Sequence, residues 1–217
     1  GAPAAPAEQG FTRDYSIELF DEAVLFTPSA ADEMYLVKWD NPVHVFVFGD
    51  GPNQIKPSVE PLIAEIKSLT HLDIQYSDKA VNLALVISND IGADIDVGGR
   101  YGAAIRTLYS SEQAYNRAVE QQQKSNSPCF NAAGITNGRF RGVFVAADAK
   151  AGLASVRKCL VQNFVAGFGI FGYPEIRVDS LFNRPQSDFV ASGLRLQDRK
   201  STRLNSSHRC ISYAVFC

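Results

Sequence analysis

Runs of hydrophobic residues predict four β-strands along the chain. The run 43–48 is β-branched and aromatic and is followed by the glycine and proline turn 49–52, a pattern typical of a buried central strand. The shorter apolar runs 72–76 and 81–87 predict two further strands. A fourth strand is expected at 140–146.

Three stretches carry apolar residues at the three- and four-residue spacing of amphipathic helices. They predict a helix over 58–70, a helix capped by Ser110 or Ser111, and a helix over 149–167. Residues 89–101 contain several glycines and indicate a long loop. The order strand, helix, two strands, helix, strand, helix fits an α+β domain and a small α/β sheet equally well.

The overall composition is that of a globular protein. The chain has 217 residues, of which 46% are hydrophobic and 11% aromatic, which is typical of one domain that can bury a core. Its longest strongly apolar run is far too short to span a bilayer, so we expect no transmembrane segment. The net charge of −2 argues against a broad basic face, and nucleic acid is therefore not an expected partner.

Both ends differ in composition from the rest of the chain. Residues 1–10 are rich in Gly, Ala and Pro, which is typical of a flexible leader behind a cleaved secretory signal or a lipid anchor; a truncated reading frame is the alternative. Residues 198–217 are Ser-rich and basic and resemble a translated sequencing-library segment, with a genuine terminal strand over 211–216 as the alternative. We therefore expect a single domain over 11–197, followed by a non-native tail.

Leaving out the tail 198–217 changes the charge and the cysteine count. The tail holds four of the 21 basic and one of the 23 acidic residues, so the rest of the chain has 17 against 22 and a net charge of −5. Cys129, in the expected loop before Phe140, and Cys159 are the cysteines that remain. Paired, they would close a loop of about 30 residues, stabilise the fold by about 3 to 4 kcal/mol and indicate an oxidising compartment. Two buried free thiols are the alternative.

Three segments of the chain form a recognisable pattern. The segment 159–170 begins with a Cys and ends in a glycine-containing helix end. Residues 179–183 are Asp-Ser-Leu-Phe-Asn, and residues 39–43 are Trp-Asp-Asn-Pro-Val before an apolar strand. In this order and spacing they resemble the bacterial family called domain of unknown function 2927, over about residues 35–189. The chain departs from the family pattern because it lacks the acidic pair that usually follows the Cys.

This resemblance implies a zincin-like α+β fold, in which a small mixed sheet packs against helices that include the 149–167 helix. In zincin metallopeptidases such a helix carries two His that bind zinc and a Glu that activates the bound water. The corresponding residues here are Gln162, Asn163 and Ala166. Neutral amides are poor zinc ligands and poor bases, and a methyl group has no donor atom. The resemblance therefore implies a degenerate site with no catalytic residue, no metal and no cofactor.

The amide pair Gln162 and Asn163 leaves two interpretations of this helix open. The amides could hydrogen-bond an extended peptide or glycan lying in the former active-site cleft, or they could satisfy backbone groups of a neighbouring strand. We expect a secreted or envelope-associated bacterial protein, in the periplasm or outside the cell, with lipid anchoring through its N-terminal side as one option. Its expected role is non-catalytic binding or scaffolding, with an envelope peptide or glycan as the partner.

A metal-independent hydrolase of an envelope glycan or peptide is the alternative function. It would use acids such as Asp94, Asp96 or Asp179. Two carboxyl groups that act as acid and base on a glycan lie within about 5 to 10 Å of each other. An enzyme of this kind should therefore bring these acids to the Gln162 face, whereas a binding module should show a groove or an exposed sheet edge there.

Overall fold

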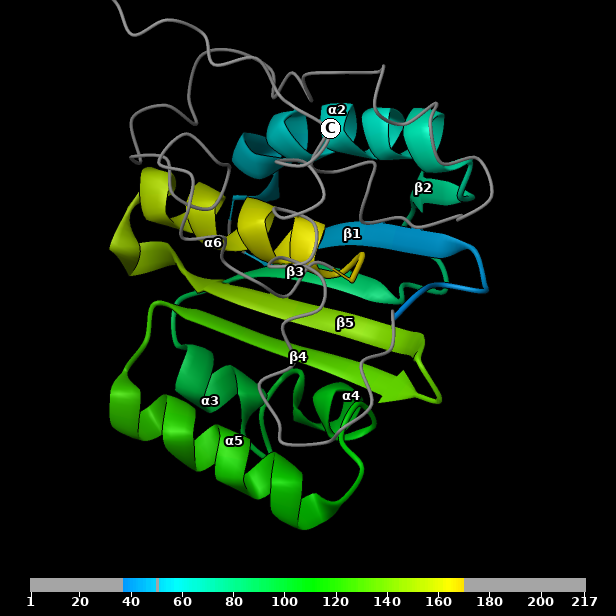
Figure 1. The fold of residues 1–217 in the computed structure, drawn as a ribbon. Helices are drawn as coiled ribbons and strands as arrows, with labels where there is room; N and C mark the ends of the chain where they lie inside the picture. Colours follow the sequence, from blue (N-terminus) through cyan, green and yellow to red (C-terminus); the bar gives the residue numbers. More distant parts are fainter. Residues whose placement is uncertain (1–36, 50, 170–217) are drawn as a thin grey trace, which may run out of the picture.

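The computed structural model describes residues 37–49 and 51–169 (Figure 1). The leader 1–10, the motif 179–183 and the tail 198–217 lie outside the described residues. The described elements are, in chain order, β1 (Val43–Gly49), α2 (Pro52–Thr70), β2 (Ile74–Tyr76), β3 (Leu83–Ser88), α3 (Ile91–Ile95), α4 (Gly102–Arg106), α5 (Glu112–Ser125), β4 (Cys129–Thr136), β5 (Arg139–Asp148), a 3₁₀ turn (Ala149–Ala151) and α6 (Leu153–Ala166).

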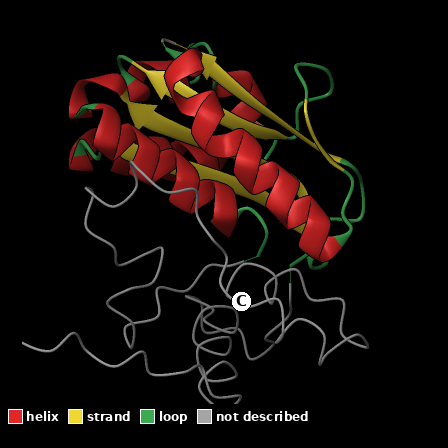
Figure 2. Ribbon diagram, turned by 90° about the horizontal axis from the view of Figure 1, so that it is seen from above, coloured by secondary structure: helices red, strands yellow, loops and turns green. Residues whose placement is uncertain are grey.

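The five strands form one mixed sheet in the order β2-β1-β3-β5-β4. Strands β2, β1, β3 and β5 are parallel, and β4 runs antiparallel to β5 at one end of the sheet. Helices α2 and α6 cover one face, whereas α3, α4 and α5 cover the other (Figure 1). Seen from above, α2 and α6 lie over the strands of the sheet (Figure 2). The expected α+β class, a small mixed sheet packed against helices, is confirmed.

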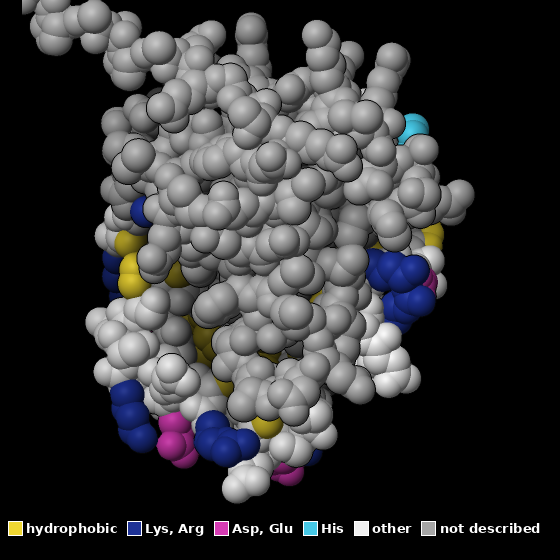
Figure 3. All heavy atoms as spheres, viewed as in Figure 1, with side chains coloured by type: hydrophobic (Ala, Val, Ile, Leu, Met, Phe, Trp, Pro, Cys, Tyr) yellow, Lys and Arg dark blue, Asp and Glu magenta, His cyan; other side chains and the backbone are white. Residues whose placement is uncertain are grey.

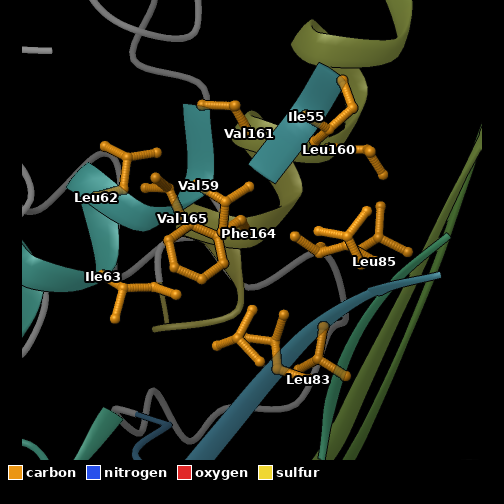
Figure 4. Close-up of a cluster of buried hydrophobic side chains, with 14 of the residues drawn as sticks. Ile55, Val59, Leu62, Ile63, Leu83, Leu85, Leu160, Val161, Phe164 and Val165 are labelled. Atoms are coloured by element: carbon orange, nitrogen blue, oxygen red, sulfur yellow. The ribbon is translucent and has the colours of Figure 1, made fainter. Parts of the chain in front are cut away.

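The larger of two hydrophobic cores lies between the sheet and helices α2 and α6, and every second side chain of β1 belongs to it. Val43, Val45 and Val47 are at most 1% exposed and face α2 and α6, because successive side chains of a strand point to opposite faces. The helices fill this side with residues that recur at helical spacing, and Figure 4 shows how they meet the side chains of β3; the labelled ones are Ile55, Val59, Leu62, Ile63, Leu83, Leu85, Leu160, Val161, Phe164 and Val165.

A smaller core lies on the opposite face of the sheet. Val86 of β3 and Phe144 of β5 contact Ile95, Ile105 and Tyr115 of the three helices there. The Tyr115 hydroxyl is buried and donates a hydrogen bond of 2.6 Å to the carbonyl oxygen of Ile95. This bond satisfies a buried polar group and ties α5 to the end of α3.

Helix α2 begins six residues earlier than the predicted helix 58–70. Pro57 and Pro61 lie inside the helix, and a proline normally interrupts one because it has no N–H to donate. Ile55 is nevertheless fully buried against the sheet, and its burial offsets the missing backbone bond. Packing against the sheet therefore sets where this helix starts, and the prediction from Ser58 as a cap was wrong.

Strand β4 occupies residues that were expected to form a loop. It joins β5 through Asn137 and Gly138, whose φ angles are +51° and +69°. Two consecutive left-handed residues form the hairpin turn that matches the twist of paired strands. The segment 89–101 was likewise expected to be a loop, and it contains the short helix α3, capped by the Asp90 carboxylate at the backbone N–H of Ala93.

Trp39 anchors the C-terminal end of α6. Its indole ring stacks on Phe140 with the ring centres 5.0 Å apart, and its Nε1–H donates a 2.7 Å hydrogen bond to the carbonyl oxygen of Gly167. A helix end leaves carbonyl groups without partners in the helix, and Trp39 satisfies one of them. The second half of α6 is therefore held against the sheet.

Alkaline pH should destabilise the smaller core. Burial raises the pKa of Tyr115 and Asp96 raises it further, against an opposing effect of Arg106, so the folded protein keeps this proton to higher pH than the unfolded chain. The free energy of unfolding should be unaffected by this group below about pH 10 and should fall above it, because only the unfolded chain ionises there. Urea unfolding at about pH 7 and about pH 10.5 measures the fall.

The Tyr115→Phe variant is the control for this prediction. It should lose about 1 kcal/mol at neutral pH, since the hydrogen bond to Ile95 is gone, and its stability should depend less on pH above about 10. Part of the dependence should persist, because burial also raises the pKa of Tyr109. An unchanged pH dependence would contradict the assignment to Tyr115.

Candidate functional site

Gln162, Asn163 and Ala166, the site residues that the resemblance implies, lie in the second half of α6. Gln162 is buried at 9% exposure, whereas Asn163 and Ala166 are half-buried. Helix α6 packs on the sheet over β5 and β3, which leaves the α6-facing side of β4 accessible. Asn163 therefore lies at the boundary between the helix and the outermost strand.

Cys129 and Cys159 form the predicted disulfide. It links the first residue of β4 to the middle of α6, with 5.7 Å between the two Cα atoms. Cys159 is 7% exposed and belongs to the larger core. The bond holds the outermost strand against the helix at the position where the site residues begin.

Asn163 extends this connection with three hydrogen bonds. Its Nδ2 donates to the carbonyl oxygen of Cys159 at 2.8 Å and to Sγ of Cys129 at 3.3 Å. Its Oδ1 accepts a bond of 2.7 Å from Nδ2 of Asn131, which lies on β4. An amide group has two donor hydrogens, so both donors of Asn163 are used within the protein.

The outer edge of β4 presents backbone groups that β5 does not use. The N–H of Asp148 donates to the carbonyl oxygen of Pro128, and antiparallel strands alternate between residues that bond to each other and residues whose N–H and C=O point away. By this alternation Cys129, Asn131 and Ala133 direct their backbone groups away from β5. The Ser127 hydroxyl bonds to both backbone groups of Cys129.

Asn131 and Ala133 therefore form the open part of this edge. Their outward N–H and C=O groups have no partner among the residues that the structure describes. Their side chains and that of Ile135 are exposed on the face that carries α6. The site thus combines an unpaired strand edge with the Asn163 side of a helix.

The structure gives Gln162 and Asn163, expected from the sequence to act as an amide pair, two different environments. Gln162 and Asn163 do not face a ligand together, because Gln162 is buried and Asn163 contacts Asn131 instead. Sequence reasoning missed Asn131 and Ala133, since β4 was expected to be a loop. The Asn137–Gly138 dipeptide was the available signal, because Asn-Gly between apolar runs is a strong indicator of a hairpin.

Asp94 and Asp96, two of the three acids named for the alternative hydrolase, lie away from α6. Asp94 and Asp96 lie on or next to α3, which packs on the opposite face of the sheet. Oδ2 of Asp94 accepts a 2.8 Å bond from the Ser88 hydroxyl, and its Oδ1 lies 3.6 Å from the Arg100 guanidinium. Asp179 lies outside the described residues. In the structure Asp94 connects α3 to Ser88 at the end of β3.

Charges of both signs alternate on the α5 side of the molecule. Figure 3 shows Lys and Arg side chains beside Asp and Glu side chains in its lower part. The ion pairs Arg106–Glu112 and Lys124–Glu120 involve residues of α4 and α5, at 3.3 and 3.5 Å. Over residues 37–49 and 51–169, no three His, Cys, Asp or Glu side chains are grouped so that they could hold a metal ion. None of the described helices is both long and apolar enough to cross a membrane.

The fold and the site define an α+β domain in which a disulfide ties an exposed edge strand to a buried helix. Comparison with models of protein families, with curated proteins and with solved structures finds no match. The resemblance to the domain of unknown function 2927 family and to the zincin fold therefore stays a prediction. So does the degenerate character of Gln162, Asn163 and Ala166.

Removing the disulfide should destabilise the domain without changing its architecture. The Cys129→Ala, Cys159→Ala double variant should lose about 3 to 4 kcal/mol of unfolding free energy, because the unfolded chain regains the entropy of an open loop. Denaturant unfolding measures this loss. As a control, the unaltered protein under reducing conditions should show a similar loss, and equal stability of oxidised and reduced protein would contradict a structural role.

The purified protein should contain no stoichiometric zinc. Gln162, Asn163 and Ala166 offer no ligand that competes with His or Cys for this ion. Elemental analysis of the protein after dialysis against zinc checks the expectation. One zinc per chain, retained after the Cys and His of residues 198–217 are replaced by Ser, would overturn the interpretation of this helix.

Proposed function

We propose that this protein is a non-catalytic binding module of a bacterial envelope or secreted protein, and that its ligand is an extended peptide. The peptide pairs with the outer edge of β4 and lies beside α6. The module works in the periplasm or outside the cell. Its zincin-like helix has kept the position beside the sheet and lost the metal chemistry.

The outer edge of β4, which has no partner strand within residues 37–49 and 51–169, is the observation that carries this proposal. Exposed strand edges are templates for another strand, and proteins usually protect them with charged residues, with prolines or by making the strand short. Strand β2, at the other end of the sheet, has three residues. Strand β4 has eight, and none of them is charged or a proline.

Strand addition favours a peptide over a glycan. The outward N–H and C=O groups of Asn131 and Ala133 recur every second residue, which is the repeat of an extended polypeptide backbone. Main-chain hydrogen bonds of this kind supply affinity, and the side chains along the edge supply selectivity. A glycan has no backbone with this repeat, so it is an outcome to be tested and not the proposed ligand.

Three further features support the non-catalytic assignment and the compartment. Gln162, Asn163 and Ala166 carry no group that binds zinc well or exchanges a proton near neutral pH. The Cys129–Cys159 disulfide fits an oxidising compartment, where such bonds persist. Asp94 and Asp96, two of the acids named for the alternative hydrolase, lie on or next to α3 at the opposite face.

A proline at position 133 should weaken peptide binding. Ala133→Pro removes an outward N–H that β5 does not use, so the β4–β5 ladder keeps its bonds while the ligand loses one. Calorimetry of the full chain with a library of unstructured peptides and with peptidoglycan fragments should find peptide ligands. Their affinity should fall about tenfold or more in the proline variant.

The matched control is Ala133→Ser, which keeps the N–H and a small side chain. It should bind the same peptides about as well as the unaltered protein. If both variants bind equally, strand addition at β4 is wrong. If peptidoglycan fragments bind and peptides do not, the ligand is a glycan and the proposal is overturned.

A further inference from the structure

The side chain of Asn131 is held in one orientation by the residues behind it. Asn163 uses both of its donor hydrogens on Cys159 and Cys129, so only its Oδ1 can face β4. That oxygen accepts from Nδ2 of Asn131 at 2.7 Å. The order of donors and acceptors therefore fixes which end of the Asn131 amide is the nitrogen.

Asn131 keeps one donor and one acceptor for a ligand. Its second Nδ2 hydrogen and its Oδ1 have no partner within the described part of the chain, and the residue is exposed. A single N–H beside a single carbonyl oxygen is complementary to another carboxamide, which offers the same two groups in the reverse order. Because the Asn131 amide is already oriented, binding does not have to order it first.

The same residue also carries outward backbone groups. In an added antiparallel strand, the residue opposite Asn131 would exchange both backbone hydrogen bonds with it. The side chains of two such residues lie on the same face of the sheet, about 4.5 to 5.5 Å apart at Cβ, and they interact directly. The ligand side chain opposite Asn131 would therefore lie against the free groups of its amide.

We propose, on the basis of the function proposed above, that the bound strand carries Asn or Gln opposite Asn131. The edge selects a carboxamide at this position. Asn163 is a positioning residue, since it acts by orienting Asn131 and does not touch the ligand. Stacked amide side chains on adjacent strands stabilise each other in the same manner.

The neighbouring position of the edge selects a different side chain. Ala133 is the next residue with outward backbone groups, and its methyl group leaves room on the α6-facing side. Ile135, on the same face, is 37% exposed and offers an apolar contact. The ligand residue opposite Ala133 is therefore apolar, and an antiparallel ligand has the order apolar, any residue, Asn or Gln from its N- to its C-terminus.

A charged residue is disfavoured opposite Asn131. A carboxylate in place of the carboxamide would accept from the free Nδ2 hydrogen, but it would have no hydrogen for Oδ1. It would also lose part of its hydration, and β4 itself supplies no charged residue to offset that loss. The edge thus separates Gln from Glu, two side chains of nearly equal shape.

Three synthetic peptides test this selectivity. The first is Ser-Thr-Val-Thr-Gln-Thr-Ser, and the other two replace Gln with Glu or with Leu. Calorimetry on the full oxidised chain should give an affinity about two- to tenfold higher for the Gln peptide than for the Leu peptide, the range expected for one or two net hydrogen bonds. The Glu peptide should bind at least as weakly as the Leu peptide.

The variant Asn131→Leu removes the amide and keeps the backbone groups. In this variant the Gln and Leu peptides should bind with equal affinity. The matched control is Asn116→Leu, at an exposed position of α5 on the opposite face, which should keep the preference for Gln. A second readout needs no variant: in NMR spectra of the unaltered protein, the Asn131 side-chain amide signals should shift with the Gln peptide and not with the Leu peptide.

The outcomes separate this inference from the proposed function. If the three peptides bind equally, or if Asn131→Leu keeps the Gln preference, the carboxamide selectivity is wrong. Strand addition still stands in that case, provided that Ala133→Pro weakens all three peptides. If Ala133→Pro changes nothing while the Gln preference disappears in Asn131→Leu, the amide contact is real and strand addition is wrong. If none of the peptides binds, both are wrong.

Discussion

Strand β4 has to turn back on β5 within two residues, and the left-handed backbone of Asn137 and Gly138 makes this return possible. The turn sets the register of the pair, because a hairpin of fixed length allows one alignment of its strands. In this register Cys129 meets Cys159, and Asn131 meets Asn163. The backbone groups of Asn131 and Ala133 point outward for the same reason. A slip of one residue would turn each of these groups to the other side.

Helix α6 is fixed at two points along its length, and this rigidity is what a preformed binding edge requires. The disulfide holds its middle against β4, and Trp39 holds the carbonyl group of Gly167 at its end. Between these points Phe164 is fully buried among the residues of the larger core. Asn163 therefore cannot move away from β4 without disturbing the core, and the Asn131 amide keeps its orientation. Binding to an ordered edge avoids much of the entropy that a mobile strand would lose.

The sequence anticipated the elements whose signals are local. The β-branched and aromatic run 43–48 corresponds to β1, the helical spacing in 149–167 to α6, and Ser111 is the observed cap of α5. The start of α2 was not anticipated from the sequence, because Pro57 and Pro61 are unfavourable in a helix. Only the burial of residues such as Ile55 offsets the cost of these prolines. Strand β4 was missed because its apolar residues are irregularly spaced, although Asn137 and Gly138 mark its turn.

For the site, the sequence by itself determined the chemistry that is present: two cysteines able to pair, and a helix that carries the neutral amides Gln162 and Asn163 side by side in the chain. Only the tertiary structure decided which of these amide side chains contacts Asn131. Gln162 and Asn163 are adjacent in the chain, yet the packing of α6 buries the first and brings the second to Asn131, 32 residues away. The reason is physical: the direction of a side chain on a helix, or of an N–H on a strand, depends on the partner element, and the partner is chosen by burial of the whole core.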